Sequence, residues 1–312
     1  MTLAVSTTGV SKRYGSVRAL DALDLQVEEG SLFGLLGPNG AGKSTAFGIM
    51  CGWLKADAGE SLVLGVASQR AHLLGGRVAA LPQDATFPPQ ISIRDQLCHF
   101  GRLNGMTGSK ARREADRVLE LVGLEDKRKA KGRELSHGMS KRAGLAQALL
   151  GSPSLIFLDE PTAGLDPKNA RAIKDLMAEL VPRTTVIVSS HNLAEVQEIC
   201  THAAILDHGK TQYNGRVEEL TRTRGELVFE LGPGPLPSVE TLQERLNVTA
   251  RLSPGLLEVS YSDERDSADV IRGTIEQLFS QDVPLLGVRR GISLEGAFLE
   301  LTGNGPQAPE DS

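Results

Sequence analysis

Short apolar runs alternate with helical patterns from the start of the chain to about residue 220. The run Ser31–Leu36 has the length and composition of a buried strand, and it leads through a glycine-rich turn into a helical stretch, Ser44–Leu54. Two more buried strands are expected at Leu155–Leu158 and Thr185–Ser189, with a helix over Pro167–Leu180 between them. This alternation of strands and helices predicts an α/β layer structure.

The stretch from about residue 84 to residue 150 departs from that alternation. It contains three helical patterns, Ile93–Leu103, Lys110–Val122 and Met139–Leu150, without a strand between them. We therefore expect a helical subdomain inserted into the α/β layers.

Past residue 221 the composition changes, and the turn-rich sequence GPGPLP follows at residues 232–237. The remaining pattern reads strand, helix, strand, strand, helix, strand, over Leu227–Leu231, Val239–Leu246, Val248–Leu252, Leu256–Val259, Ala268–Ser280 and Leu285–Arg289. That order predicts a small α+β domain of ferredoxin-like arrangement. A last amphipathic helix is expected at Ser293–Leu301, before a polar tail (303–312) that we expect to be disordered. The predicted division is thus 1–221, 222–302 and 303–312.

The charge balance argues against nucleic acid as a partner. The chain has 34 Lys and Arg against 39 Asp and Glu, so its formal charge of −5 provides no overall positive field.

The three cysteines, Cys51, Cys98 and Cys200, lie far apart and form no disulfide framework or zinc motif. The N-terminus lacks the apolar core of a signal peptide, and no apolar run approaches the ~20 residues that span a bilayer. We expect any work at a membrane to go through a partner.

A glycine-rich turn follows the first buried strand and opens a helix. Its sequence fits G-x-x-x-x-G-K-[ST], the phosphate-loop motif, over Gly37, Pro38, Asn39, Gly40, Ala41, Gly42, Lys43, Ser44 and Thr45. Glycines let consecutive backbone N–H groups turn inward around a polyphosphate, and the helix N-terminus adds a favourable field. Lys43 is expected to reach the β- and γ-phosphates, and the Ser44 hydroxyl to ligate Mg²⁺. The motif predicts an ATP site.

Two carboxylates end the next buried strand. Asp159 and Glu160 follow the four apolar residues Leu155–Leu158, so the strand delivers them beside the phosphate loop. Asp159 suits the magnesium shell, because Mg²⁺ prefers oxygen ligands. Glu160 is then placed to orient or polarise the attacking water.

Between these two motifs lies Leu135–Arg142, with the sequence LSHGMSKR. Here the chain resembles the ATP-binding cassette (ABC) family, whose signature LSGGQ precedes a basic helix. Leu135, Ser136 and Gly138 match that signature, whereas His137 replaces the first glycine and Met139 replaces the glutamine. These departures resemble the branch that serves type-two exporters of drugs, lipids and polysaccharides. Ser136 and Gly138 open a helix and so offer donors to a γ-phosphate; the alternative is that Ser136 is only an N-cap.

The resemblance assigns roles to four more residues. Tyr14 corresponds to the aromatic residue that stacks on adenine, and Gln83 to the glutamine that senses Mg²⁺ and links to the transmembrane partner. Asp166 ends a loop, AGLD, that resembles the one crossing the dimer interface. His191 resembles the switch histidine that contacts the γ-phosphate.

The resemblance implies an ATPase subunit that works as a dimer and powers export through a separate transmembrane permease subunit. Each ATP would lie between the phosphate loop of one subunit and the Ser136 segment of the other. The dimer is either a homodimer or a heterodimer with a second ATPase subunit, located at the cytoplasmic face of the membrane through the permease. Residues 1–221 would be the nucleotide-binding domain, and residues 222–302 an accessory or dimerisation domain. The stretch after Gln83, including Phe87, is the expected docking site for the permease.

The sequence argues against two other functions. An ABC protein acting on ribosomes or DNA would be expected to carry two cassettes or a long coiled coil, and this chain has one phosphate loop and no sustained heptads. A regulatory module that binds ATP without hydrolysing it is disfavoured because Glu160 and His191 are both present.

Overall fold

The computed structural model describes residues 2–221, 226–261, 265–290 and 298. By their internal contacts the residues form two compact units, Met1–Gly215 and Arg216–Ser312, and each is described by itself. The helix predicted at Ser293–Leu301 and the tail predicted after it lie outside the described residues, apart from Phe298.

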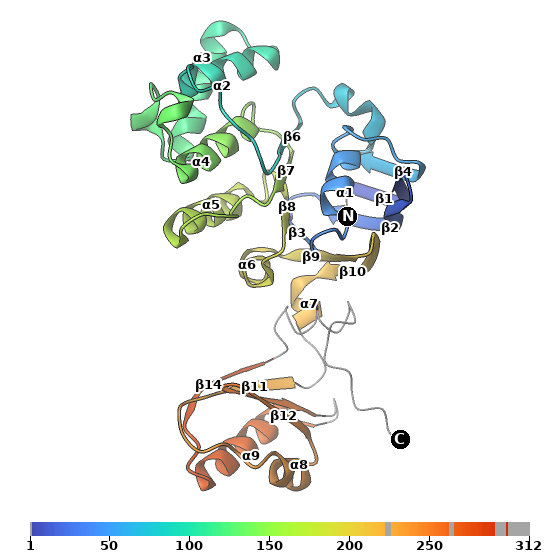
Figure 1. The fold of residues 1–312 in the computed structure, drawn as a ribbon, viewed down its shortest axis with the longest axis vertical. Helices are drawn as coiled ribbons and strands as arrows, with labels where there is room; N and C mark the ends of the chain where they lie inside the picture. Colours follow the sequence, from blue (N-terminus) through green and yellow to red (C-terminus); the bar gives the residue numbers. More distant parts are fainter. Residues whose placement is uncertain (1, 222–225, 262–264, 291–297, 299–312) are drawn as a thin grey trace. The chain divides into compact units, whose positions relative to one another are not determined.

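A six-stranded sheet forms the centre of the first unit (Figure 1). Its strand order is β10-β9-β3-β8-β7-β6, with bounds Lys210–Arg216, His202–Asp207, Leu32–Leu36, Thr185–Ser190, Leu155–Asp159 and Val78–Leu81. The five strands from β9 to β6 pair in parallel. Strands β3 and β8 are buried along their whole length, as their apolar sequences predicted. Because parallel strands end at one edge, this sheet brings the loops after β3, β7 and β8 together.

The first unit also contains a four-stranded antiparallel sheet, which the sequence analysis did not predict. Its order is β2-β1-β4-β5, over Val17–Glu28, Leu3–Tyr14, Ala58–Val63 and Val66–Ala67. The α/β alternation expected from the N-terminus is therefore wrong for this part. Strand β2 is half-buried with a two-residue period, since Leu23, Leu25 and Val27 are buried and the residues between them are exposed. That period is typical of a sheet with one covered face.

The helices follow the predicted positions, with shifted ends. The predicted helical stretch holds α2 (Ile93–Leu103), α3 (Gly108–Leu121) and α4 (His137–Ala148), and α5 covers Pro167–Leu180 as predicted. Helix α1 (Lys43–Met50) ends earlier than expected, and α6 (Leu193–Ile199) was not predicted. Three short 3-10 helices lie at Ser68–Leu74, Glu125–Lys127 and Gly132–Glu134. In Figure 1, α4 and α1 lie well apart, on different sides of β6 and β7.

The second unit begins with α7 (Val217–Thr221). It continues through β11, α8, β12, β13, α9 and β14, over Glu226–Leu231, Val239–Leu246, Thr249–Ser253, Leu256–Ser260, Ser267–Ser280 and Leu285–Arg290. The β-α-β-β-α-β order is the one that the sequence predicted. These strands form an antiparallel sheet in the order β12-β13-β11-β14. Leu227, Phe229 and Leu257 are fully buried in a core of the unit's own.

Candidate functional site

The phosphate loop joins the buried strand β3 to α1 at the carboxyl edge of the central sheet. Gly42 directly precedes α1 with φ 104°, and a Cβ there would come within 2.5 Å of the Ala19 carbonyl oxygen, so only glycine fits. No side chain in the described part of the chain caps this end of the helix. The first-turn N–H groups of α1 are therefore available to an anion.

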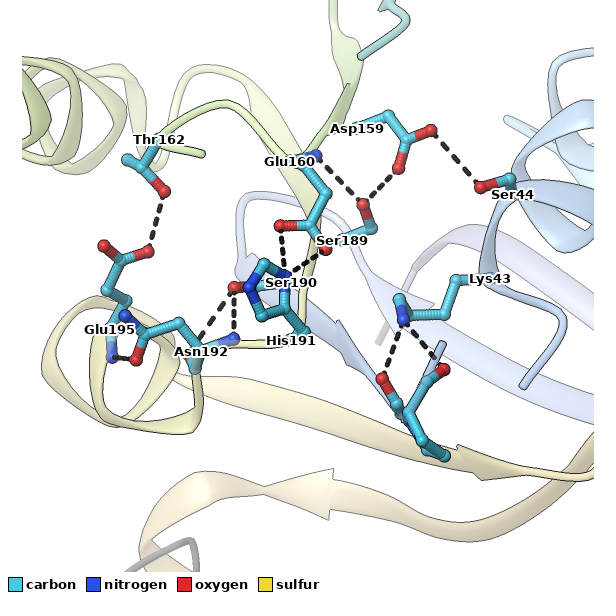
Figure 2. A network of polar contacts seen from close by, with 12 residues as sticks. Lys43, Ser44, Asp159, Glu160, Thr162, Ser189, Ser190, His191, Asn192 and Glu195 are labelled. Carbon is cyan, nitrogen blue, oxygen red and sulfur yellow. Dashed lines mark hydrogen bonds and ion pairs between the residues drawn. The ribbon is translucent and has the colours of Figure 1, made fainter. Parts of the chain in front are cut away.

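Lys43 turns back over the loop that precedes it (Figure 2). Its Nζ donates hydrogen bonds to the carbonyl oxygens of Gly37, at 2.7 Å, and Pro38, at 3.1 Å. Burial lowers the pKa of Lys43, while the nearby carboxylates of Glu160 and Asp159 act in the opposite direction. The ammonium group thus lies within the loop, close enough to two carboxylates for their charge to act on it.

Asp159 and Glu160 are held by one serine of the neighbouring strand. The register of β7 against β8 sets Asp159 beside Ser189. The Ser189 hydroxyl donates to Asp159 and accepts, at 3.0 Å, from the backbone N–H of Glu160. Asp159 is also within 3.4 Å of the Ser44 hydroxyl on α1. Ser189 is fully buried, so the Asp159 carboxylate and the Glu160 backbone are both anchored from inside the sheet.

Glu160 adopts an unusual backbone conformation, with φ 48°. This left-handed conformation is costly for a residue with a side chain, and such strain gathers at functional sites. It turns the carboxylate of Glu160 toward His191, whose Nδ1 lies 2.9 Å from both carboxylate oxygens. Since an ionised carboxylate only accepts, Nδ1 is assigned as the donor. The Glu160 side chain is 10% exposed and that of His191 is 61% exposed.

A cleft of about 250 Å³ lies over the phosphate loop. Its lining brings together most of the predicted residues and adds part of β2: Val17, Arg18, Ala19, Asn39, Gly40, Gly42, Lys43, Ser44, Thr45, Gln83, Asp159 and Glu160. Gln83 reaches the cleft from the loop after β6. Val17 and Arg18 were not among the predicted site residues.

Tyr14 stands at the tip of the β1–β2 hairpin, where it pairs with Val17. It is 47% exposed and is not among the described residues that line the cleft, whereas Val17 is. Asp57 holds this tip, because its carboxylate accepts from Lys12 Nζ and from the Arg13 backbone N–H, both at 2.8 Å. The hydrogen bond from Lys12 is the main reason that the pKa of Asp57 is lowered.

The residues of the signature segment do not line this cleft in the part of the chain that the structure describes. Ser136 is exposed and caps α4, since its hydroxyl accepts from the Met139 backbone N–H at 3.2 Å. Gly138 is buried in the first turn of the same helix. Asp166 caps α5 through Asn169, and the same contact lowers the pKa of Asp166. The N-cap interpretation of Ser136 therefore describes its contact within this chain.

The positioning contacts of Ser189 were missing from the sequence analysis. The one feature of the sequence that could have indicated them is that Ser189 ends a predicted buried strand, which we expected to lie in the same sheet as the strand that carries the carboxylates. A second such contact joins Thr162 to Glu195 on α6, at 2.7 Å, and so ties the loop after Glu160 to the helix after His191 (Figure 2).

Comparison with known proteins identifies the class. The family model described as ABC transporter matches residues 20–163. Among solved structures, a nucleotide-free ATP-binding cassette from an ABC transporter superposes with a TM-score of 0.62 at 26% identity, over 70% of this chain and 92% of that one. The structure of cbiO1 from Clostridium perfringens, part of the ABC transporter complex cbiONQ, gives 0.63 at 26% identity, over 70% and 91%.

Two curated relatives extend the likeness over nearly the whole chain. The daunorubicin resistance ATP-binding protein DrrA3 of Streptomyces coeruleorubidus is 34% identical over 98% of both chains. The Nod factor export ATP-binding protein I of Ralstonia nicotianae is 32% identical over 96% of this chain and 94% of its own.

The chain belongs to the ABC transporter family, in the branch of ATP-binding subunits that serve exporters, as the motifs predicted. It is an ATP-binding and ATP-hydrolysing subunit; such subunits dimerise and pair with transmembrane components. Within the described residues, no helix combines the length and the apolar character needed to cross a membrane.

Proposed function

We propose that two copies of this cassette, or this cassette and a second one, enclose ATP between them. In each site the phosphate loop of one subunit faces Ser136 and Gly138 of the other. The observation that carries this proposal is the separation of the two motifs within one chain: the cleft at Lys43 contains neither signature residue among its described lining. The start of α4 is exposed at Ser136, and that hydroxyl still has its own proton to donate while it accepts from Met139.

Each residue of the phosphate-loop site then has a role. Lys43 and the first-turn N–H groups of α1 bind the β- and γ-phosphates. Glu160 accepts a proton from the attacking water, or orients that water, while Ser189 holds its backbone in place. His191, tied to Glu160 and open on its other side, contacts the γ-phosphate. Tyr14 stacks on the adenine ring. Catalysis by such an arrangement depends on position and charge, without a covalent nucleophile on the protein.

The donor set at the base of the cleft fits Mg²⁺. The Ser44 hydroxyl and the Asp159 carboxylate approach to 3.4 Å, and both are hard oxygen ligands of the kind that Mg²⁺ prefers. Gln83, which also lines the cleft, would supply a third oxygen. When bound, the ion would neutralise charge on the phosphate oxygens.

We further propose that the cassette works at the cytoplasmic face of a membrane by docking to a permease subunit. The loop after Gln83 is the proposed docking site for the permease, and Phe87 within this loop is half-buried. Relatives named for daunorubicin resistance and for Nod factor export support transport out of the cell. The selectivity for one substrate would belong to the permease.

The state of association tests the shared site. Purified Glu160→Gln protein should change from monomer to dimer on addition of ATP and Mg²⁺, measured by light scattering after size exclusion. A protein that stays monomeric while binding ATP would contradict the proposal. The matched control is Lys43→Ala in the same background, which should stay monomeric because its phosphate site is lost.

A further inference from the structure

Helix α4 approaches the central sheet most closely at a glycine. A Cβ added to Gly144 would lie 2.9 Å from the side chain of Leu81, the last residue of β6. This missing side chain lets the helix rest directly on the end of the strand. Gln83 lies two residues beyond Leu81, so α4 passes the start of the Gln83 loop.

One turn before Gly144, Lys141 reaches that loop. Its Nζ donates a 2.8 Å hydrogen bond to the backbone carbonyl oxygen of Gln83. Lys141 is half-buried and makes no ion pair with any residue that the structure describes. Its ammonium group is thus committed to a main-chain atom of the loop. A charge-assisted hydrogen bond of this kind is stronger than a neutral one.

Little else fills the space between α4 and the loop. A cavity of about 430 Å³ lies there, lined by the loop residues 83–86, by His137, Ser140 and Lys141 on α4, and by Ala163 and Gly164. The loop itself contains a turn in which the Ala85 N–H donates to the Pro82 carbonyl at 3.3 Å. Side chains do not close-pack across the cavity, and among the described residues the bond from Lys141 is the hydrogen bond that joins this turn to α4.

We propose that Lys141 is a positioning residue for ATP hydrolysis, which ties the Gln83 loop to the helix that carries Ser136 at its start. Gln83 lines both the ATP cleft and the cavity at α4, so a movement of Gln83 affects both places. A displacement of the loop by the membrane partner is then passed to α4 and to Ser136. This inference rests on the proposed function, which gives Gln83 and Ser136 their roles.

The next residue on α4 provides a matched control. Arg142 Nη1 also donates to main-chain carbonyls, those of Val122 and Gly123, at 3.2 Å each. These carbonyls directly follow α3, within the helical subdomain. Arg142→Met therefore removes the same kind of bond from the same helix without touching the Gln83 loop.

The test compares Lys141→Met, Lys141→Arg and Arg142→Met in the full-length protein. Loss of one such partly exposed hydrogen bond should change a rate or an equilibrium constant about three- to tenfold. Lys141→Met should lower kcat by that factor, leave KM for ATP unchanged, and speed hydrogen exchange of the Ala85 amide in peptides covering residues 82–87. Lys141→Arg should restore kcat and exchange toward those of the unmodified protein. Arg142→Met should lower Tm only. Unchanged exchange in Lys141→Met, or the same changes in Arg142→Met, would overturn the inference.

Gln83→Ala separates this inference from the proposed function. A lower kcat in Gln83→Ala together with an unaltered Lys141→Met would overturn the Lys141 link and leave the role of Gln83 standing. An unaltered kcat in Gln83→Ala would overturn the role of Gln83, and with it the catalytic consequence of the link.

Discussion

His191 Nδ1 lies 2.9 Å from both carboxylate oxygens of Glu160, although 31 residues separate the two in the sequence. Glu160 is buried and His191 is open to solvent. The pair therefore presents a protected carboxylate and an accessible ring on one side of the phosphate loop. This arrangement suits a carboxylate that acts on water next to a histidine that meets the γ-phosphate.

Glu160→Gln tests the carboxylate. The amide keeps the size of the side chain but cannot accept the proton of the attacking water, so kcat should fall about 10²-fold or more. Binding of ATP should persist, because in the proposed site the phosphates are held by Lys43 and α1 and not by Glu160. A phosphate-release assay beside a nucleotide-binding titration checks both points. Hydrolysis at a near-normal rate would remove Glu160 from this role.

Asp57→Asn tests whether the tip of the β1–β2 hairpin contributes to ATP binding, as the proposed stacking of Tyr14 on adenine requires. The substitution weakens the contacts that Asp57 makes with Lys12 and Arg13, next to Tyr14. Because this ion pair is exposed, KM for ATP should rise only about two- to fivefold, with kcat unchanged. Lys210→Met, which removes another exposed ion pair with an aspartate, Asp21, is the matched control and should leave KM unaltered. An unchanged KM in Asp57→Asn would show that the hairpin tip does not contribute to ATP binding.

Truncation tests the division of the chain. The two units have separate buried cores, so a chain that ends after residue 221 should fold and bind ATP with an unchanged Kd. Circular dichroism and a titration with a fluorescent ATP analogue measure the two properties. Loss of folding or of binding would show that both regions form one cooperative unit. With binding intact, a weaker ATP-dependent dimer would support a dimerisation role for residues 222–302.

Local sequence explains why much of the fold could be predicted. The phosphate loop needs only a strand, a run of glycines and a helix that are contiguous in the chain, and α2, α5 and α8 were predicted with the observed bounds. The antiparallel sheet of the first unit was not predicted, because the α/β alternation was extended to the N-terminus and the two-residue period of β2 was not recognised.

Contacts between distant segments could not be predicted in the same way. Ser189 holds Asp159 only because β7 and β8 pair in one particular register. Lys141 meets the Gln83 carbonyl 58 residues away because Gly144 lets α4 rest on Leu81. No motif in the sequence distinguishes Ser189 or Lys141 from other serines and lysines. Their contacts arise from the packing of the elements that carry them.

The shared site is the central claim, and a mixture of two inactive variants tests it most directly. Lys43→Ala removes the charge that holds the phosphates, and Ser136→Arg places a bulky side chain where the facing γ-phosphate would lie. Neither variant alone should occlude or hydrolyse ATP. Loss of the N-cap alone, in Ser136→Ala, should cost only about 1 kcal/mol of stability, so that variant reports the contribution of capping.

In a heterodimer of the two variants, both lesions fall in one site and the other site is intact. After mixing, the amount of radiolabelled ATP trapped in dimers measures ATP binding at that intact site. This measurement does not require hydrolysis, so it applies even where both sites must be intact for turnover. The shared-site account predicts that the mixture of folded variants regains ATP occlusion, at about half a molecule or less per chain because only heterodimers carry one good site. A mixture that occludes no more ATP than either variant alone, although both are folded and form heterodimers, would contradict it.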